Sequence, residues 1–507
     1  MAKVQVIRRP ERFLSDDSRV IAHFLDIGDP RRAKAIIARV LALDEPQVHQ
    51  LYQRVMEEFA HRHRRLEGPL ERHFGYVRHL IADPDALTHE RRMLIGSYFT
   101  MEYAIESAAL FNPSIVPHPD QGGVGEGAVR FIMSLRATGE GHVSSIVFRT
   151  GIISGDGSID FDPPSRFCAK LRVKPDRNYE KKLFFLKLIE MAAYNDAARV
   201  ILEQLPESFT LELLLRAVDD VRKWEKKPPN FNATAENMLW LARSNYHLHL
   251  PPDTDPSEIV IFPVSENESR GIEDARLTRF TEDDGQVTYI GTYTAYNGFN
   301  ILPQIFETRN FLDFEVHTLN GRYVQNKGMA LFPRRIDGLY HMLSRIDGEN
   351  LYLMRSDNIH FWNECRKLQG PAYPWELLQI GNCGPPIETP AGWLMLTHGV
   401  GPMRQYCIGC SLLDLEDPRK VIGHLSEPLI APLESERDGY VPNVVYSCGA
   451  MIHGDRLVIP YAMSDSATSV ATVSVSELLS ELTTHSPSCP LPAEAPRRRR
   501  RIRQKSA

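Results

Sequence analysis

The sequence predicts a mainly β fold that carries a helical N-terminal domain and a helical insertion. Apolar residues recur at spacings of three and four from residue 17 to about residue 110, which is typical of amphipathic helices. From residue 111 onward, short runs of alternating apolar and polar residues indicate strands, and a second helical pattern interrupts them. We therefore expect a helical domain over residues 1–110, a β domain over residues 111–482 with a helical insertion at about residues 178–245, and a disordered basic tail over residues 483–507.

The helical domain is expected from two apolar stripes. One runs through Ala33, Ile37 and Val40, and the other lies within residues 51–59. The histidines and arginines of residues 61–65 are interpreted as a solvated helix face, with a role in substrate binding as the alternative.

The β domain is expected from alternating runs at residues 129–135 and 143–148, and the strand pattern resumes at residue 259 after the insertion. A unit of strand, polar turn, aromatic strand, small turn and strand then recurs at intervals of about 50 to 65 residues. This interval is close to one four-stranded blade. The repeats by themselves indicate a propeller-like arrangement.

The charge of the chain is distributed unevenly. The formal net charge is −6, and residues 497–505 carry seven positive charges, which leaves about −13 for the rest of the chain. Such a tail could hold nucleic acid or an anionic membrane, but it follows a Pro-rich stretch and has nothing apolar to fold with. No aromatic residues lie among the arginines, so stacking on single strands has no support. We expect a disordered appendage, with neither nucleic acid nor a membrane as partner.

Cysteine usage and the N-terminus predict a cytoplasmic protein. The seven cysteines, an odd number, do not indicate a disulfide framework. The N-terminus lacks the apolar core and cleavage site of a secretory signal, and the chain has no apolar stretch long enough to span a membrane. Cys407 and Cys410 form a lone CxxC, which we interpret as two buried strand residues rather than a metal site.

The most informative motif is Gly-Ile-Glu-Asp-Ala-Arg at residues 271–276, which leads into an aromatic and β-branched run at residues 289–298. Glu273, Asp274 and Arg276 would stand at the end of a strand, where a fold can present ionisable side chains to a pocket. A turn with a surface ion pair is the alternative for such a cluster on its own.

Further motifs follow this one in a fixed order. They are Asn-Lys-Gly-Met-Ala-Leu-Phe-Pro at residues 326–333, Gly-Pro-Pro-Ile-Glu at 384–388, Thr-His-Gly at 397–399 and Val-Pro-Asn-Val-Val-Tyr-Ser-Cys-Gly at 441–449, with Phe-Asn-Pro at 111–113 and Arg-Phe-Ile-Met-Ser-Leu-Arg at 130–136 before them. Together these segments resemble glycoside hydrolase family 130, the inverting mannoside phosphorylases and related β-mannosidases. The resemblance covers residues 111 to 480.

The resemblance implies a five-bladed β-propeller and a phosphorolysis. A β-manno-oligosaccharide and inorganic phosphate, as co-substrate, would give α-mannose 1-phosphate and a shortened acceptor, with inversion. Cleavage of a glycosidic bond needs a proton for the leaving oxygen and a nucleophile on the other face of the sugar. Asp274 matches the family's general acid, thought to act through a hydroxyl of the bound mannosyl residue, and Glu273 and Arg276 would orient it or hold the sugar. No metal or organic cofactor is implied.

Phosphate is an anion, so its site needs cations where a hydrolase needs a second carboxylate. By resemblance Lys327, His398 and Arg309 form the phosphate site. Each alone could be a solvated residue on a propeller rim.

The resemblance implies that four further side chains bind the mannosyl residue, in addition to Glu273 and Arg276. These are Asn112, Arg136, Asn297 and Asp465. For Asp465 an Asx-turn is the alternative.

Two other functions remain open at this point. An inverting β-mannosidase would be favoured if the cations did not converge and a second carboxylate, for example Glu388, faced the anomeric carbon across a water. A catalytically silent propeller could instead act as an interaction scaffold through its helical domain and tail. The helical domain and the insertion are candidates for a cap over the pocket or for a homo-oligomer interface.

Overall fold

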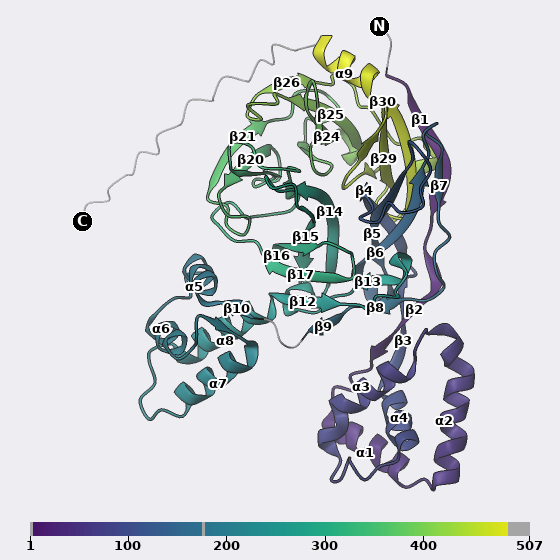
Figure 1. Cartoon of the computed structure of the whole chain (residues 1–507), viewed down its shortest axis with the longest axis vertical. Helices are drawn as coiled ribbons and strands as arrows, with labels where there is room; N and C mark the ends of the chain where they lie inside the picture. The colour runs from purple at the N-terminus through teal and green to yellow at the C-terminus, as the bar shows by residue number, and fades with distance from the viewer. Residues whose placement is uncertain (1–3, 175–177, 485–507) are drawn as a thin grey trace, which may run out of the picture.

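The computed structural model describes residues 4–174 and 178–484. Its architecture is mainly β, as the sequence predicts, and most of its helices are gathered in two units beside the strands (Figure 1). Most of the predicted basic tail, from residue 485 onward, lies outside the described residues. In the part of the chain that the structure describes, no helix is long and apolar enough to cross a membrane.

The strands of the β region form mostly antiparallel groups that follow one another along the chain, and β8 pairs with β13 in parallel. The first two groups are joined by a parallel pair between Gly271 and Ser144. The first group contains β4 (Ala109–Pro117), β5 (Val129–Thr138), β6 (Ser144–Ile153), β7 (Ile159–Phe161), β13 (Ile259–Ile261) and β8 (Ala169–Lys170). The second contains β14 (Gly271–Thr281), β15 (Val287–Tyr296), β16 (Ile301–Thr308) and β17 (Asp313–Thr318), extended by β12 (Tyr246–His249) and β9 (Arg172–Lys174).

Three more groups follow toward the C-terminus, drawn in green and yellow in Figure 1. The third contains β18 (Ala330–Leu331), β19 (Tyr340–Ser344), β20 (Leu351–Ser356) and β21 (Glu364–Gln369). The fourth contains β22 (Gln379–Asn382), β23 (Ile387–Thr389), β24 (Gly392–Val400), β25 (Tyr406–Leu413) and β26 (Val421–His424). The fifth contains β27 (Val445–Tyr446), β28 (Met451–His453), β29 (Arg456–Met463), β30 (Ala467–Ser474) and, from the other end of the chain, β1 (Val6–Phe13). Helix α9 (Val475–Thr484) follows β30.

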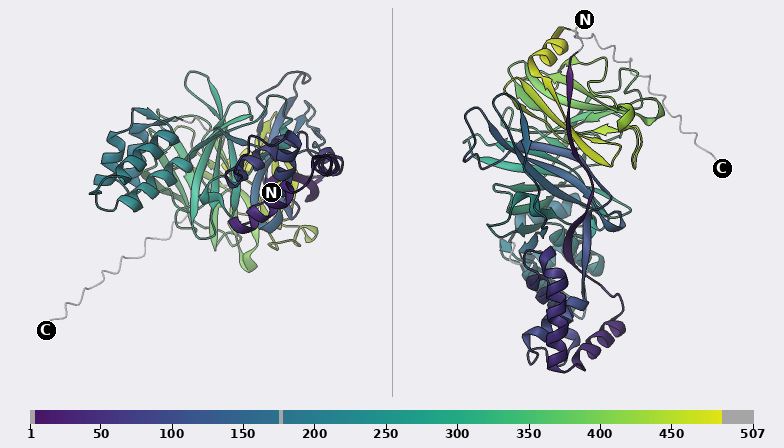
Figure 2. Two further views of the ribbon diagram at one scale, coloured as in Figure 1. Left: turned by 90° about the horizontal axis from the view of Figure 1, so that it is seen from below. Right: turned by 90° about the vertical axis from the view of Figure 1, so that its right-hand side faces the viewer.

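The N-terminal region differs from the all-helical expectation at both of its ends. β1 pairs with β30, and β2 (Asp16–Phe24) pairs with β3 (Thr100–Glu106). Ile21 of β2 and Ile105 of β3 pack into the core of the first strand group, so burial against distant strands overrides the local pattern. Figure 2 shows the N-terminal segment running along the β region before it reaches the helices.

Between β2 and β3 lie the helices of the N-terminal unit: α1 (Pro30–Leu41), α2 (Glu45–Phe59), α3 (Glu67–Val77) and α4 (His89–Tyr98). Asp29 caps α1 and is followed by Pro30, which is preorganised for the first helical position. Asp44 and Gln47 form a capping box at the start of α2. Ile37, Val48 and other apolar residues of the four helices share one core.

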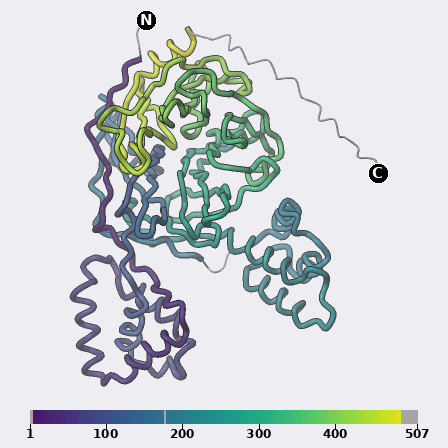
Figure 3. The backbone as a smooth tube through the Cα atoms, turned by 180° about the vertical axis from the view of Figure 1, so that it is seen from behind, coloured from purple at the N-terminus to yellow at the C-terminus, as the bar shows by residue number. Residues whose placement is uncertain are grey.

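A second helical unit lies between β9 and β12, where the sequence predicts the insertion. It contains β10 (Tyr179–Glu180), α5 (Lys181–Glu190), α6 (Asp196–Glu203), β11 (Ser208–Phe209), α7 (Leu211–Arg222) and α8 (Phe231–Arg243). Phe184, Ile201 and Val218 belong to a core that this unit forms by itself. Both helical units project from the same end of the β region (Figure 3).

Candidate active site

Asp274 and Asn112 meet at two irregularities in neighbouring strands. The pairing of β14 with β15 shifts register between Glu273 and Arg276, and Asp274, inside this bulge, has a φ of 57°. β4 is irregular at Asn112, whose φ is 49°. A bulge re-aims a side chain out of the regular alternation of a strand. Here Nδ2 of Asn112 donates to Oδ1 of Asp274 at 2.6 Å.

Arg136 on β5 ties the two carboxylates of the motif together. Its guanidinium donates to Glu273 at 3.0 Å and to Asp274 at 3.4 Å. The ring of Phe111 lies 5.0 Å from the guanidinium carbon, and Nε donates to the hydroxyl of Ser144 at 3.0 Å. These contacts fix the plane of the guanidinium, which a flexible lysine could not match.

Lys327 reaches the same carboxylates from the loop before β18. Its Nζ forms an ion pair with Glu273. The Lys327 side chain is 32% exposed whereas that of Glu273 is 11% exposed. Glu273 therefore fixes an ammonium group that solvent, and hence a ligand, can still reach.

Arg276 is buried and holds the bulge in place. One of its nitrogens donates to the backbone oxygen of Asp274 at 2.9 Å, and another donates to the hydroxyl of Tyr446 at 2.8 Å. The Arg276 side chain is 2% exposed, and these two contacts already engage its guanidinium. The geometry therefore favours the orienting role for Arg276 over direct contact with a sugar.

Asp274 and Asp465 are carboxyl groups in opposite environments. Burial would raise the pKa of Asp274, but three neighbouring cations and the hydrogen bond from Asn112 hold it below its usual value of 3.8. Burial and the charge of Asp274 raise the pKa of Asp465 to about 6. No hydrogen bond from the described residues reaches the Asp465 carboxyl, so an Asx-turn does not explain this residue.

The raised pKa of Asp465 predicts a pH-dependent effect of Asp465→Asn. Folding disfavours the charged carboxylate, so between pH 3.8 and about pH 6 this group makes the wild type less stable as the pH rises. Asparagine does not titrate, so the variant should gain about 1 to 3 kcal/mol of stability relative to the wild type as the pH rises from 3.8 to about 6. Thermal unfolding of both proteins at pH 4 and pH 7 measures the effect. A relative stability that stays constant or falls with pH would contradict the placement of Asp465 beside Asp274.

His398 on β24 forms a second centre with Arg345, which follows β19. Nδ1 of His398 lies 3.0 Å from the carbonyl oxygen of Asn382 and donates to it. Nε2 lies 3.1 Å from a guanidinium nitrogen of Arg345. Burial and the charge of Arg345 lower the pKa of His398 well below 6.5, so the ring is neutral and Nε2 accepts from Arg345.

Gly381 leaves the space that this pair occupies. It lies opposite His398 in the pairing of β22 with β24. A Cβ atom at Gly381 would stand 2.4 Å from Cε1 of His398 and 3.3 Å from Cδ of Arg345. A larger residue at this position would displace both side chains.

The Arg345–His398 pair adjoins the acidic centre through two sets of contacts. Gly328, which follows Lys327, accepts a hydrogen bond from Asn382 at 2.6 Å. The ring of Tyr446, which Arg276 holds, lies 5.0 Å from the ring of His398. Carboxylates able to bind or protonate oxygen thus stand beside cations able to hold an anion.

The structure does not bring Arg309, which the resemblance assigns to the phosphate site, into this arrangement. Arg309 follows Thr308, which pairs with Tyr289 near the first residue of β15. Glu273 pairs with Thr294, near the last residue of the same strand. About five residues of strand separate Arg309 from the level of Asp274, roughly 17 Å. Its guanidinium donates instead to Gln286 at 3.1 Å, in an exposed turn.

Asn297 and Glu388 are likewise engaged elsewhere. Oδ1 of Asn297 accepts from the backbone of Phe299 and Asn300 at 3.0 and 2.7 Å, which makes it the organiser of the turn after β15. Glu388 pairs with Arg334 at 2.7 Å. It lies on β23 and pairs with Trp393 at the start of β24, whereas His398 lies near the last residue of β24. Glu388 is therefore not a second carboxylate for this site.

Three residues of the site, Arg345, Tyr446 and Arg404, were not predicted from the sequence. Arg345 stands at the end of a predicted strand, just before an Asp-Gly turn, and this position is the signal that could have identified it. Arg404 lies in an exposed turn, where its backbone is left-handed. Its charge opposes part of the rise in the pKa of Asp465. Tyr446 lies inside a motif that the sequence analysis had singled out, but its contact with Arg276 joins strands far apart in the chain.

A separate group of potential metal ligands comes from β16, β17 and the turn after β20. Atoms of Glu307, His317 and His360 lie within 4.8 Å of one another. β15 separates these strands from β14, which carries Asp274. Cys407 and Cys410 of the lone CxxC are buried in β25 and carry no disulfide, in agreement with their interpretation as strand residues.

Comparison with known proteins gives consistent matches. A family model described as β-1,4-mannooligosaccharide phosphorylase matches residues 253–484. A 1,2-β-oligomannan phosphorylase of Thermoanaerobacter sp. (strain X514) is 34% identical over 224 residues, which cover 42% of this chain and 72% of the relative. A β-1,2-mannobiose phosphorylase of Listeria innocua is 30% identical over 257 residues, which cover 49% of this chain and 70% of the relative. The solved complex of a Listeria innocua β-1,2-mannobiose phosphorylase with β-1,2-mannobiose aligns with a TM-score of 0.44 and 23% identity, over 75% of this chain and 93% of that chain.

Proposed function

This chain belongs to glycoside hydrolase family 130, and we propose that it catalyses the inverting phosphorolysis of a β-mannoside. A β-manno-oligosaccharide and inorganic phosphate would give α-mannose 1-phosphate and a shortened acceptor. The observation that carries the proposal is the position of Lys327 and the Arg345–His398 pair beside Asp274. Such a site can hold phosphate next to a group that handles protons.

Asp274 is the proposed general acid. The cations around it keep it ionised in the absence of substrates, because they lower its pKa. Bound phosphate would neutralise part of this positive charge and raise the pKa of Asp274. The carboxyl could then take up a proton and deliver it to the leaving oxygen, directly or through a hydroxyl of the mannosyl residue.

Phosphate is the proposed nucleophile. One of its oxygens forms a bond to the anomeric carbon while the bond from that carbon to the acceptor oxygen breaks, so the configuration inverts. Lys327 and Arg345 would hold the other phosphate oxygens and stabilise the charge that moves during transfer. The neutral Nε2 of His398 could accept a hydrogen from Arg345 or from the phosphate itself.

The mannosyl residue is proposed to lie against Asn112, Arg136 and Asp465. Asp465 offers carboxyl oxygens without a partner among the described residues, which sugar hydroxyls could use. Arg136 and Asn112 fix Asp274 and line the same centre. Asn297 contributes through the shape of its turn, since its side-chain oxygen is already occupied.

We infer that the five strand groups are the blades of a five-bladed β-propeller. The order of the groups along the chain supports this, as does the pairing of β1 with β30, which joins the two ends of the chain in one group. The helical domain before β4 and the helical insertion would then be additions to the propeller, available for a cap or for a homo-oligomer interface. The six described cysteines carry no disulfide, which supports our proposal of the cytoplasm as the compartment.

An inverting β-mannosidase is the second candidate, because Asp465 could act as its base. Its pKa of about 6 suits a group that accepts a proton from water. A silent scaffold is less well supported, since it gives no reason for Asp274 to be surrounded by cations in a buried bulge.

Product analysis in the presence and absence of inorganic phosphate tests the proposal. We expect α-mannose 1-phosphate from β-1,2- or β-1,4-mannobiose only when phosphate is added, because the cations bind the anion that attacks. The two linkages are included because relatives with either name match the chain. Free mannose released equally well without phosphate would establish the β-mannosidase instead. If neither substrate gave any product, the catalytically silent scaffold would be the remaining function.

A further inference from the structure

A cavity of about 520 Å³ lies between the N-terminal helical unit and the β region. Arg65, Pro69, Arg72 and Tyr76 line it from α3 and the residue positions just before that helix. Their spacing of four, three and four residues places them on one helix face. β2, β8 and β9 form the opposite walls, and none of the candidate active-site residues takes part.

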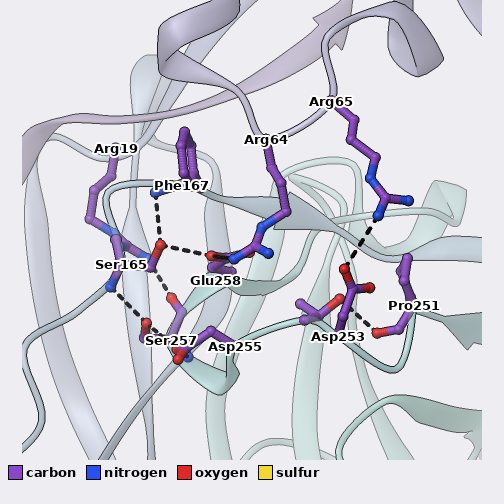
Figure 4. Close-up of polar contacts among 11 residues, drawn as sticks. Arg19, Arg64, Arg65, Ser165, Phe167, Pro251, Asp253, Asp255, Ser257 and Glu258 are labelled. Atoms are coloured by element: carbon purple, nitrogen blue, oxygen red, sulfur yellow. Dashed lines mark hydrogen bonds and ion pairs between the residues drawn. The ribbon is translucent and has the colours of Figure 1, made fainter.

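Ion pairs and hydrogen bonds fix these walls relative to one another (Figure 4). Arg64 pairs with Glu258, and Arg65 pairs with Asp253 at 3.3 Å. The hydroxyl of Ser165 donates to the same Glu258 carboxylate at 2.7 Å. Asp253 and Glu258 are the only acidic residues of the cavity lining among the described residues, and each therefore has a cationic partner already.

Three further cations of the lining have no acidic partner among the residues that the structure describes. Within the described ranges, no carboxylate lies at ion-pair distance from Arg72, Lys170 or Arg172. Lys170 stands over the ring of Phe262, with Nζ 4.5 Å from the ring centroid. Arg172 reaches the first turn of α3, where a Cβ atom at Gly68 would lie 3.7 Å from one of its nitrogens.

These cations also repel one another. Burial and the charge of Arg72 lower the pKa of Lys170 to about 8, and burial and the charge of Arg172 lower the pKa of Arg72. Arg72 and Lys170 are partly buried, and placing positive charge where water is partly excluded is unfavourable. An anion placed among the three groups would remove this repulsion, and the paired walls would hold the site ready for it.

We propose that this cavity binds a phosphate monoester of a small molecule, at a site separate from the catalytic one. Two guanidinium forks and an ammonium group suit the several oxygens of a phosphate dianion. The volume lies in the range of small-molecule sites and exceeds what a single inorganic ion fills. Phe24 and Tyr76, whose rings lie 5.1 Å apart at 90°, offer an aromatic surface for a sugar or a base.

Binding at this cavity would connect two parts of the chain. Arg72 belongs to α3 of the helical unit, whereas Lys170 and Arg172 belong to β8 and β9 beside the helical insertion. A phosphate group that contacts all three would bridge the helical unit and the β region. The bridge stabilises the folded chain, so the ligand should raise the Tm.

Isothermal titration of the full chain tests the proposal. The probes are mannose 1-phosphate, adenosine 5′-monophosphate and inorganic phosphate, and the proteins are the wild type and Arg72→Gln/Lys170→Gln. Any binding at the catalytic site is common to both proteins, so the difference reports the cavity. We expect the variant to lose one binding event for at least one monoester, or to bind it tenfold or more weakly, and to lose the rise in Tm. The wild-type affinity should fall with added salt.

Lys174→Gln is the matched control, because Lys174 lies on β9 outside the cavity and pairs with Asp313 at 2.7 Å. It removes one positive charge from the same region without touching the cavity lining, and it should bind all probes as the wild type does. Should the double variant fail to fold, Arg172→Gln replaces it, since Arg172 is exposed. Equal affinity and stoichiometry of wild type and variant for every probe would overturn the proposal. An effect on inorganic phosphate alone would overturn the assignment to monoesters.

Discussion

Asp274→Asn should lower kcat for α-mannose 1-phosphate formation by a factor of about 10³, within the range of 10² to 10⁴ for loss of a general acid. Asparagine keeps the shape of the side chain and tolerates the left-handed backbone at this position, where φ is 57°. Arg136 retains its contact with Glu273, and Arg276 retains the backbone oxygen that it binds. The fold should therefore survive, with the Tm close to that of the wild type. Initial rates at saturating phosphate and mannobiose provide the measurement.

The matched control for this substitution is Glu388→Gln. Glu388 is also a carboxylate paired with an arginine, but it lies away from His398 along β24. Its replacement should leave the rate within about twofold of the wild type, since it contacts no group in the site. An Asp274→Asn variant that retains full activity would remove Asp274 from the acid role. A large loss in Glu388→Gln would instead point to a hydrolytic pair that includes Glu388.

The fold class could be predicted because the local pattern of most segments agrees with their place in the structure. Alternation marks strands such as β5 and β6, and helical spacing marks α1 and α2. The strands at the N-terminus could not be predicted in this way. β1 finds its partner in β30, at the opposite end of the chain, and no window of local sequence contains that pairing.

The carboxylate side of the site was predicted better than the cation side. Glu273, Asp274 and Arg276 are adjacent in sequence, so a single motif contains their chemistry, and Asn112 and Arg136 do meet them in space. The cations come from separate loops. Only the arrangement of β16, β19 and β24 shows that Arg345 lies beside His398 and that Arg309 points into an exposed turn.

Two bulges explain why these particular residues became available. In a regular strand Asp274 and Asn112 would follow the alternation of β14 and β4, with every second side chain in the core. The register shifts in both strands release them from that pattern. Periodicity in the sequence cannot reveal such a shift, because a bulge needs the partner strand to define it.

Arg345→Gln should lower kcat/KM for phosphate by a factor of about 10² to 10³, the usual cost of removing one positioned donor to a charged group. The same substitution should change KM for the mannoside only slightly, because Arg345 adjoins His398 rather than Asp274. Glutamine can still donate to Nε2 of His398, so the neutral ring remains in place. Steady-state rates with phosphate varied at fixed mannobiose, and the reverse series, separate the two effects.

Arg309→Gln is the control that distinguishes the structure from the pattern in the sequence. It removes a guanidinium from an exposed turn, where its only side-chain hydrogen bond among the described residues is to Gln286. We expect unchanged kinetics for both substrates and a Tm within about one degree of the wild type. If Arg309→Gln weakens phosphate use and Arg345→Gln does not, the phosphate site lies elsewhere than beside His398. If both variants have a lower kcat/KM for phosphate alone, the turn that carries Arg309 must approach the site when substrate is bound. Such a movement would have to break the pairing of β16 with β15.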